Sequence, residues 1–436
     1  MRFSAGSLPS VVAVAAFLAR ASVYARPQSY AIWAADSAIA RGQGNGLDSN
    51  GNPTVSYEHG ELQWGLRLLY ETTGNKSYFN YIVQGASQIV DSKGNIGGGY
   101  SIADYSQDPV RLVTFIDDWL QYCNLNAHQN GTDICISVAL IPVAYIHPTA
   151  NIRPRLYRYE QTGQSKWKTA MDTYHQQLMG QPRTAQGQFW HKLRYFNQGW
   201  LDGIYMGEIF YTVYTNAFQP TNTTAYADIA KQFDLMFQNT LQEEGAANYT
   251  GLLYHGYDYS HTASWASPDR GHSPEVWDRA MGWYMMALVD ILEIYPKDKS
   301  IFLEHLNTLV PRVRDAADPD SGVWWLVMTQ PRRAGNYFES SGSAMFVYAM
   351  LKAVRLGYVV DRNGSIVKAA TKAYQYMTKN WVVDNGDGTM NWLNTVQVGS
   401  LDGNGTFEYY ISVAVDTNDL KGLAAFLLAS LEYEKL

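Results

Sequence analysis

The sequence contains an internal repeat of a helix, a tight turn and a second helix. Residues 70–74 (YETTG) match residues 159–163 (YEQTG) in register, and an aromatic residue, Tyr78 or Trp167, follows four positions after the glycine of each copy. Ahead of the first copy, residues 57–69 place leucines on one helix face. A hairpin of two helices cannot bury its apolar face alone, so a chain of repeated hairpins is expected to close into an α/α toroid.

Two weaker echoes extend the pattern. Residues 288–295 (LVDILEIY) and 351–358 (LKAVRLGY) each resemble the end of a helix and a turn before another helical stretch. Strand candidates are few, and the best is 322–328 (GVWWLVM), which could form a short hairpin at a rim. No linker rich in Pro, Ser or Gly and no block of charge divides the chain. An all-α, single-domain architecture with few short strands is therefore predicted.

The repeat has an irregular spacing. Gly74 and Gly163 lie 89 positions apart, whereas a helical hairpin with its loops occupies roughly 40–50 residues. The segment 113–152 accounts for the excess: it has 40 residues, contains Cys123 and Cys135, and carries the apolar run SVALIPVAYI outside the hairpin pattern. We interpret it as a surface excursion or as translated non-coding sequence.

The first residues have the pattern of a secretory signal. Residues 1–25 contain Arg2, an apolar stretch at 11–18 and a small-x-small ending at 23–25, which predicts cleavage near Arg26 and a single mature domain, 26–436. The apolar stretch is too short to span a membrane. Extracellular export and glycosylation agree with six Asn-x-Ser/Thr sequons, at Asn75, Asn130, Asn222, Asn248, Asn363 and Asn404. Two cysteines provide no disulfide framework, so a large core must stabilise the fold.

The composition favours a carbohydrate as the partner. Charged residues make up 17% of the chain and aromatic residues 14%, including 32 Tyr and 13 Trp, and such aromatic surface is suited to stacking on sugars. The net charge of −7 and the lack of a basic run argue against nucleic acid. No clustered His or Cys pattern indicates a metal, and no cofactor is expected.

The stretch 189–214 (FWHKLRYFNQGWLDGIYMGEIFYTVY) places Asp202 next to an apolar run that is typical of a buried helix. A buried carboxylate is costly unless it is paired or used. Asp202 could simply cap the helix 203–213. However, His191 and Trp200 lie nearby in the sequence, and further along Arg279 and Trp283 stand four apart on one helix face. Imidazole, carboxylate, cation and aromatic ring together suit an acidic sugar.

Each of these residues also has an ordinary structural explanation. His191 and His255 could be polar residues near the surface. Arg279 could pair with Asp278 or Glu275, and Trp283 could belong to the core, because aromatic spacing on a helix more often reflects packing.

Seven ordered sequence blocks carry a resemblance to a known family. They are YEHGELQWGL (57–66), ADYSQDPVR (103–111), FWHKLRYFNQGWLDGIYMGEIF (189–210), LLYHGYD (252–258), DRAMGWYMMALVDIL (278–292), NYFESSGSAMFVYAMLKAVRLGY (336–358) and EYYISVAVDTNDLKGLAAFLLA (408–429). In these blocks the chain resembles glycoside hydrolase family 105, the unsaturated rhamnogalacturonyl hydrolases, in its fungal branch. The resemblance covers nearly everything after the signal, except 113–152.

The resemblance implies a six-hairpin α/α barrel with an active site at one mouth. It implies removal of a terminal 4,5-unsaturated galacturonyl residue from rhamnose, so the partners would be unsaturated pectin-derived oligosaccharides. Asp202 would be the catalytic residue of the W-x-D-G motif and Asp108 the second carboxylate. The positions expected to bind the substrate are His191, Trp200, His255, Arg279 and Trp283.

The chemistry of such a substrate assigns a role to each side chain. Protonating C4 of the vinyl ether generates a cation at C5, and water added there gives a hemiketal that opens and expels the aglycone. Asp202 would donate and then accept the proton, with a pKa raised by a semi-apolar pocket. Asp108 would hold the substrate or the water, and Arg279 would pair with the uronate.

The remaining side chains would bind the sugar. Trp283 would stack on a ring, Trp200 would form an apolar wall, and His191 and His255 would hydrogen-bond hydroxyls.

Two alternatives remain open from the sequence. One is a sister specificity, an unsaturated β-glucuronyl hydrolase acting on other lyase products. The other is a catalytically inactive sugar-binding or mis-spliced product, since Asp108 lies five residues before the segment 113–152. In either case we expect a monomer that binds neither nucleic acid nor membrane.

Overall fold

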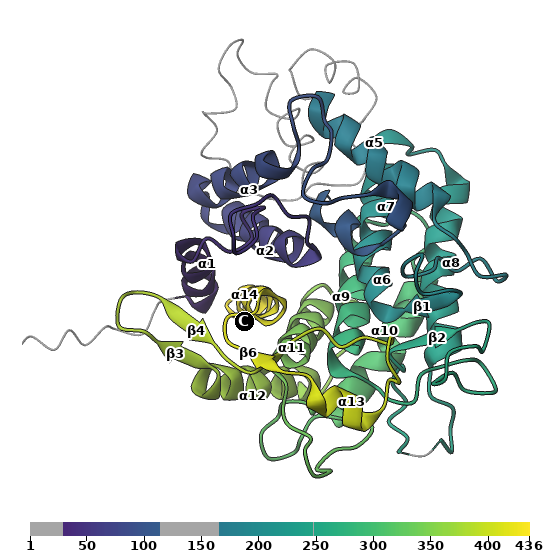
Figure 1. The fold of residues 1–436 in the computed structure, drawn as a ribbon. Helices are drawn as coiled ribbons and strands as arrows, with labels where there is room; N and C mark the ends of the chain where they lie inside the picture. The colour runs from purple at the N-terminus through teal and green to yellow at the C-terminus, as the bar shows by residue number, and fades with distance from the viewer. Residues whose placement is uncertain (1–28, 114–164, 247) are drawn as a thin grey trace, which may run out of the picture.

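The helices form two concentric layers around a common axis (Figure 1). The computed structural model describes residues 29–113, 165–246 and 248–436. The inner layer is buried almost all round and contains α2 (Tyr57–Thr73), α7 (Ile209–Phe218), α9 (Asp278–Ile294), α11 (Ser340–Arg355) and α14 (Leu420–Tyr433). The outer layer contains α1 (Tyr30–Ala40), α3 (Lys76–Ile89), α5 (Ser165–Gly180), α8 (Thr223–Thr240), α10 (Ser300–Asp315) and α12 (Ser365–Asn380).

The burial of each helix follows from its sequence. In α9 every residue from Asp278 to Leu292 is buried, because apolar residues occupy every face of this helix and its few charged residues are paired inside the protein. In α12 only one stripe is buried, formed by Ile366, Ala370, Ala373, Tyr374 and Met377. A helix that is apolar all round lies within a core, and one with a single stripe covers it.

The two ends of the described chain meet and close the ring. Helix α1 packs against α14, and α14 packs against both α2 and α11 (Figure 1). The carboxylate of Glu434 accepts hydrogen bonds from the Ser29 hydroxyl at 2.7 Å and from the Ala31 N–H at 3.1 Å. These contacts fix the first outer helix against the last inner helix.

The predicted hairpins are present where the structure describes them. Gly74 ends α2 with a left-handed φ of 70°, and the Asn75 side chain then caps α3 by accepting from the Ser77 N–H. The two weaker echoes end α9 and α11, each of which is followed by an outer helix. Three predicted features lie outside the described residues. They are the first helix of the second copy, the signal 1–25, and the segment 113–152 with both cysteines, of which only Val113 is described.

Within the described ranges, short strands pair in three antiparallel sheets of two strands each. They are β1 (Gln198–Trp200) with β2 (Gly256–Asp258), β3 (Val382–Asp384) with β4 (Met390–Trp392), and β5 (Thr395–Val396) with β6 (Val415–Asp416). The short helix α13 (Phe407–Ser412) lies between β5 and β6 in the chain. The few short strands expected from the sequence are therefore observed.

The prediction of a strand pair at 322–328 is wrong. This segment makes only single bridges, from Val327 to Trp277 and from Trp325 to Phe338. Its apolar side chains Val323, Trp324 and Leu326 are buried in the main core. An apolar run of this length indicates burial, and its partners come from two different parts of the chain, so no continuous ladder forms.

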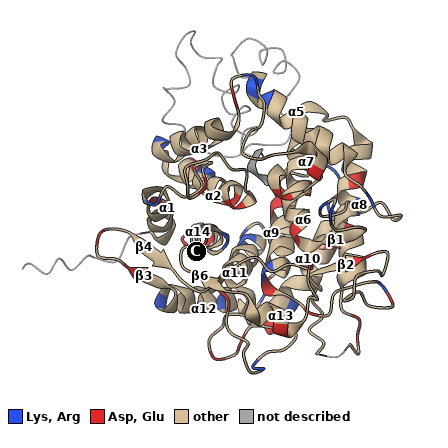
Figure 2. Ribbon diagram, viewed as in Figure 1, with Lys and Arg blue, Asp and Glu red and all other residues tan. Residues whose placement is uncertain are grey.

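Charged residues lie inside the ring as well as on its outer surface (Figure 2). Lys352 of α11, for example, binds Asp290 of α9 at 2.8 Å, and both side chains are buried. In the part of the chain that the structure describes, no helix is both long and apolar enough to cross a membrane.

Candidate active site

The pairing of β1 with β2 places Asp202 beside His255. Trp200 faces Gly256 in the register, and the next N–H, of Leu201, donates to the His255 carbonyl at 3.0 Å. A Cβ at Gly256 would lie 2.7 Å from the Gly199 carbonyl oxygen, so this approach requires glycine. The strand pair therefore fixes the first helical residues relative to a chain segment more than fifty positions away.

Asp202 lies inside the first helical turn and does not cap it. The helix begins as α6 (Leu201–Gly203), continues through a π-helical turn (Ile204–Glu208) and becomes α7. Its N-cap residue is Trp200, and no side chain makes the capping bond. The carboxylate of Asp202 is thus available for another partner, and the interpretation of Asp202 as a helix cap is wrong.

That partner is His255. Its Nε2 lies 3.1 Å from Oδ2 of Asp202, and its Nδ1 lies 2.7 Å from the hydroxyl of Tyr410. Burial raises the pKa of Tyr410 well above its usual range, so the phenol keeps its proton. With a neutral imidazole, the phenol donates to Nδ1 and the Nε2–H donates to Asp202.

This chain of contacts gives His255 a different role from the expected one. The His255 side chain is 0% exposed and both ring nitrogens are occupied within the protein, whereas the Asp202 side chain keeps 16% of its surface exposed. His255 therefore orients the carboxylate. Neither ring nitrogen of His255 is left free for the expected hydrogen bond to a sugar hydroxyl.

The pKa of Asp202 also differs from expectation. Burial raises it, but the charge and hydrogen bond of His255, with a contribution from His191, more than offset burial. The pKa of Asp202 therefore lies below its ordinary value of 3.8. The sequence suggested a semi-apolar pocket that would raise the pKa, but it did not show that an imidazole bonds the carboxylate directly.

A second carboxylate, that of Asp108, approaches the imidazole of His191. Asp108 begins the 3₁₀ helix Asp108–Val113, and its Oδ1 lies 3.5 Å from Nε2 of His191. An isolated bridge between Ser106 and Lys192 aligns the two segments. Lys192 forms an ion pair with Asp108, whose side chain is 21% exposed.

His191 interacts electrostatically with both carboxylates. Burial lowers the pKa of His191 to about 4, although the charges of Asp108 and Asp202 both act to raise it. The ring is therefore neutral at neutral pH. The structure thus brings together four predicted residues, Asp108, His191, Asp202 and His255.

Trp200 stacks against this group. Its ring centroid lies 4.6 Å from that of His191 and 4.4 Å from that of Tyr195, with near-parallel planes. Its edge meets His255 at 5.3 Å. Trp200 belongs to a small apolar cluster of its own, with Tyr195, Trp265 and Leu401. Its indole ring thus contacts the rings of both His191 and His255.

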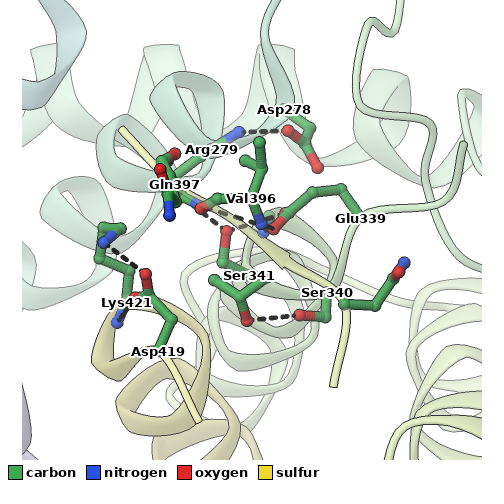
Figure 3. A network of polar contacts seen from close by, with 12 residues as sticks. Asp278, Arg279, Glu339, Ser340, Ser341, Val396, Gln397, Asp419 and Lys421 are labelled. Atoms are coloured by element: carbon green, nitrogen blue, oxygen red, sulfur yellow. Dashed lines mark hydrogen bonds and ion pairs between the residues drawn. The ribbon is translucent and has the colours of Figure 1, made fainter. Parts of the chain in front are cut away.

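Arg279 lies in the framework of the protein (Figure 3). Its side chain is 1% exposed. Its guanidinium donates to the Ser341 hydroxyl at 2.7 Å, to the Gln397 carbonyl at 2.9 Å and to the carbonyl of Val396. The carboxylate of Glu339, which caps α11, lies 3.4 Å away. Groups of the protein thus bind the Arg279 guanidinium, for which the sequence predicted a substrate uronate as the partner.

Trp283 is likewise covered. It is 1% exposed, stacks on Tyr205 at 5.0 Å and meets the edge of Tyr57 at 6.1 Å. Tyr57 is half-buried, and the charges of Arg279 and Asp108 both act on it. The partly exposed aromatic ring that interacts with the charge of Asp108 is therefore Tyr57, whereas Trp283 is covered.

Sequence reasoning missed several residues of this site. Lys192 could have been recognised, because it follows His191 and offers a cation. Tyr410 and Tyr57 gave no spacing signal, since they reach the site from distant segments, whereas Gln107 immediately precedes the predicted Asp108. Among the described residues, no group of three or more His, Cys, Asp or Glu side chains is arranged to hold a metal ion.

Comparisons with known proteins show the family of the chain. The family description Glycosyl Hydrolase Family 88 matches residues 34–436. The chain is similar to a family 105 glycoside hydrolase of C. acetobutylicum ATCC 824, with 33% identity and a TM-score of 0.77 over 94% of this chain and 100% of that one. It is also 36% identical to the 24.9 kDa protein in the picA locus of Rhizobium radiobacter, over 43% of this chain and 83% of that protein.

A more distant structure supports the fold alone. The unsaturated glucuronyl hydrolase of Bacillus sp. GL1 is 13% identical, with a TM-score of 0.56 over 93% of this chain and 96% of that one. Together with the helical layers described above, these matches confirm the predicted six-hairpin α/α barrel.

Proposed function

Because the chain belongs to Glycosyl Hydrolase Family 88, we propose that it is a secreted enzyme of pectin breakdown. In this proposal it releases the terminal 4,5-unsaturated galacturonyl residue from rhamnogalacturonan oligosaccharides. The broader statement, a glycoside hydrolase related to families 88 and 105, follows from the family match and from the 33% identical structure. The substrate, the fungal origin and the export remain part of the proposal.

One observation carries the proposal: a partly exposed carboxylate, Asp202, is held by a buried histidine and tyrosine, and His191, which interacts electrostatically with Asp202, lies 3.5 Å from a second carboxylate, Asp108. A vinyl ether needs one group that delivers a proton to C4 and one that controls the water at C5. Asp202 suits the first role because its carboxylate is oriented by His255. Asp108 suits the second because it is more exposed and is held from one side by Lys192.

The acid step requires a protonated Asp202, although its pKa is low in the free protein. A bound uronate supplies the missing influence, because a nearby negative charge disfavours the ionised carboxyl group and raises its pKa. In this proposal the substrate carboxylate thus favours the protonated form of Asp202, which can act as the acid. After water adds at C5, the same carboxylate accepts a proton and the aglycone leaves as the hemiketal opens.

Cations near the carboxylates suit an acidic sugar. Lys192 has a raised pKa, because the charge of Asp108 outweighs burial, so it stays protonated. It lies at the exposed edge of the site, whereas Arg279 is buried. Lys192 is therefore the better-placed cation for a substrate carboxylate.

The test follows the ultraviolet absorbance of an unsaturated galacturonyl-rhamnose disaccharide over time. Hydration removes the C4–C5 double bond, so absorbance falls if the enzyme is active. Asp202→Asn, which cannot transfer the proton, should slow this loss by about 10²–10⁴-fold. Ser400→Ala is a useful surface control outside the carboxylate pair. If folded wild-type protein leaves this substrate unchanged, the proposed specificity is wrong, and turnover of unsaturated glucuronyl disaccharides then decides between the sister specificity and an inactive sugar binder.

The segment 113–152 enters the same assay as a second variable. A chain lacking it should fold and be at least as active as the full chain, because the deletion restores the hairpin spacing next to Asp108. Sequencing the transcript across these codons tests the splicing interpretation directly. Secretion is tested by expression in a secreting host and by the N-terminal sequence of the product.

A further inference from the structure

A buried glutamate, Glu208, lies behind the two candidate carboxylates. It ends the π-helical turn Ile204–Glu208, which begins two residues after Asp202, and it is 0% exposed. Its Oε1 accepts a hydrogen bond from Nε2 of Gln107 at 3.4 Å. Its Oε2 is buried with no hydrogen-bond partner among the described residues. π-Helical turns often occur at functional sites, and this one places a carboxyl group in the interior.

Gln107 connects Glu208 to both carboxylate-bearing segments. It immediately precedes Asp108, and its N–H donates to the His191 carbonyl at 3.2 Å. Its amide fills the space left by two glycines of the opposite segment: a Cβ would lie 2.2 Å from its Oε1 at Gly203 and 2.8 Å from its Nε2 at Gly207. Gly203 follows Asp202 directly, so the Gln107 amide lies against the backbone next to the Asp202 carboxylate. The backbone of Gln107 continues directly into Asp108, which bears the other carboxylate.

We propose that Glu208 is a positioning residue whose neutral carboxyl group, acting through Gln107, sets the place of Asp108 relative to Asp202, and whose ionisation releases this arrangement. This inference rests on the proposed function, because it assigns a regulator to the same site. Glu208 itself is too deeply buried to touch the substrate, so its effect passes through Gln107.

The charges around Glu208 favour its neutral form. Burial raises the pKa of Glu208 to about 8, and the charge of Asp228 on α8 adds to this effect. Its own backbone N–H, Arg183 and Gln107 act in the opposite direction. The guanidinium of Arg183, however, is already bound to both oxygens of Asp228 at 2.7 Å.

The described aromatic side chains of α7 and α9 at this turn add no compensating positive charge. Tyr211 of α7 carries no positive charge, and it interacts with Asp228. From α9, the uncharged Trp283 stacks on Tyr205 of the same turn. Ionised Glu208 would therefore be a poorly compensated buried charge, which relaxes by admitting water or by displacing Gln107.

The matched substitution is Glu208→Gln, which keeps the shape and removes the titration. Ionisation of Asp202 already makes kcat/KM of the wild type fall with rising pH, so the inference predicts that this fall becomes steeper above about pH 8. This additional alkaline limb should move up by about one pH unit or more in Glu208→Gln. Lys192, Tyr57 and Tyr410 have raised pKa values, so they titrate at higher pH. Glu432→Gln, a buried glutamate of α14 paired with Arg355, is the control and should leave the limb in place.

A structural measurement decides the inference independently of turnover. Crystal structures near pH 6 and pH 9.5 should show that Gln107 separates from Glu208 and that the Asp108–Asp202 distance changes, in the wild type only. An unchanged arrangement at high pH, or an alkaline limb that is the same in Glu208→Gln, overturns the inference. Absence of activity in the wild type contradicts the proposed function instead, and the two crystal structures still test the role of Glu208.

Discussion

Nε2 of His255 lies 3.1 Å from Oδ2 of Asp202, and this contact joins a residue that follows β1 to the residue that precedes its partner strand β2. On its far side the imidazole meets the buried hydroxyl of Tyr410 at 2.7 Å. Asp202 is therefore held in place by a chain of two buried groups. The partly exposed end of that chain is the carboxylate, which is the arrangement that a directed proton donor needs.

Replacing Tyr410 with Phe should lower kcat and leave KM nearly unchanged. The substitution removes the donor that fixes the His255 tautomer but no group that reaches the substrate. A lost hydrogen bond of about 1 kcal/mol corresponds to a fall of roughly three- to tenfold. Steady-state kinetics on the unsaturated disaccharide measure both constants.

Tyr409→Phe provides the comparison from the same short helix. The Tyr409 hydroxyl accepts from the Ser400 N–H and does not contact His255. Equal losses in the two variants would show that the tyrosines act through local stability, against the positioning role of Tyr410.

The pH dependence should reflect the lowered pKa of Asp202. Above that pKa the protonated fraction of a general acid falls tenfold per pH unit, so kcat/KM of the free enzyme should rise as pH decreases toward values below 3.8. The bound uronate raises the pKa, so the kcat profile should lie at higher pH than the kcat/KM profile. Rate measurements across pH at low and at saturating substrate give the two profiles.

Replacing His255 with Gln should move the kcat/KM profile toward neutral pH. The imidazole lowers the pKa of Asp202, while burial, which raises it, remains. The maximum of kcat/KM will also fall, because the carboxylate loses its orienting partner. The test is therefore the pH at which kcat/KM changes, and not its maximum value. A profile that stays in place would show that Asp202 is not the titrating acid.

The local parts of the fold and site were accessible from the sequence. The turn at Gly74 needs a left-handed φ and was recognisable from its glycine. Asp202 and His191 stand eleven positions apart and were identified from one stretch. Tyr410 was not, because it lies more than two hundred positions from Asp202 and no local pattern predicts which tyrosine meets a buried histidine.

Helical spacing predicted a shared face for Arg279 and Trp283 but not what covers that face. Both lie on α9 as expected. The groups that occupy the guanidinium, Ser341 and the carbonyls of Val396 and Gln397, belong to α11 and the β5 region, whose placement depends on ring closure. A pattern on one helix cannot distinguish a side chain that faces substrate from one that faces another helix.

Removing the Arg279 side chain tests its framework role. Arg279→Met leaves Glu339 as a buried carboxylate without its cation, which should lower the free energy of unfolding by about 3–5 kcal/mol. Arg333→Met, which breaks an exposed pair with Glu408, should cost about 1 kcal/mol or less. Urea unfolding measures both. A stable Arg279→Met protein with a greatly raised KM would instead support the original prediction of a uronate contact.

Gly203→Ala tests the close packing between the two carboxylate-bearing segments. In a helix interior, replacing Gly by Ala usually stabilises a protein by about 1 kcal/mol. At Gly203, however, the new methyl group would lie 2.2 Å from Oε1 of Gln107 and 3.2 Å from Nδ1 of His191. Gln107 is buried between Gly203 and Gly207, so its amide has little room to move, and overpacking of about 1–3 kcal/mol should outweigh the helix gain.

The expected result for Gly203→Ala is a loss of both stability and kcat. Gly282→Ala separates the two effects, because the three atoms nearest its methyl group all belong to Met345, with the sulfur at 2.7 Å and Cβ at 2.9 Å. That variant should lose stability and keep kcat, since Met345 does not carry either carboxylate. If Gly203→Ala were more stable than the wild type and equally active, Gln107 would be free to move, and the two segments would not depend on its position.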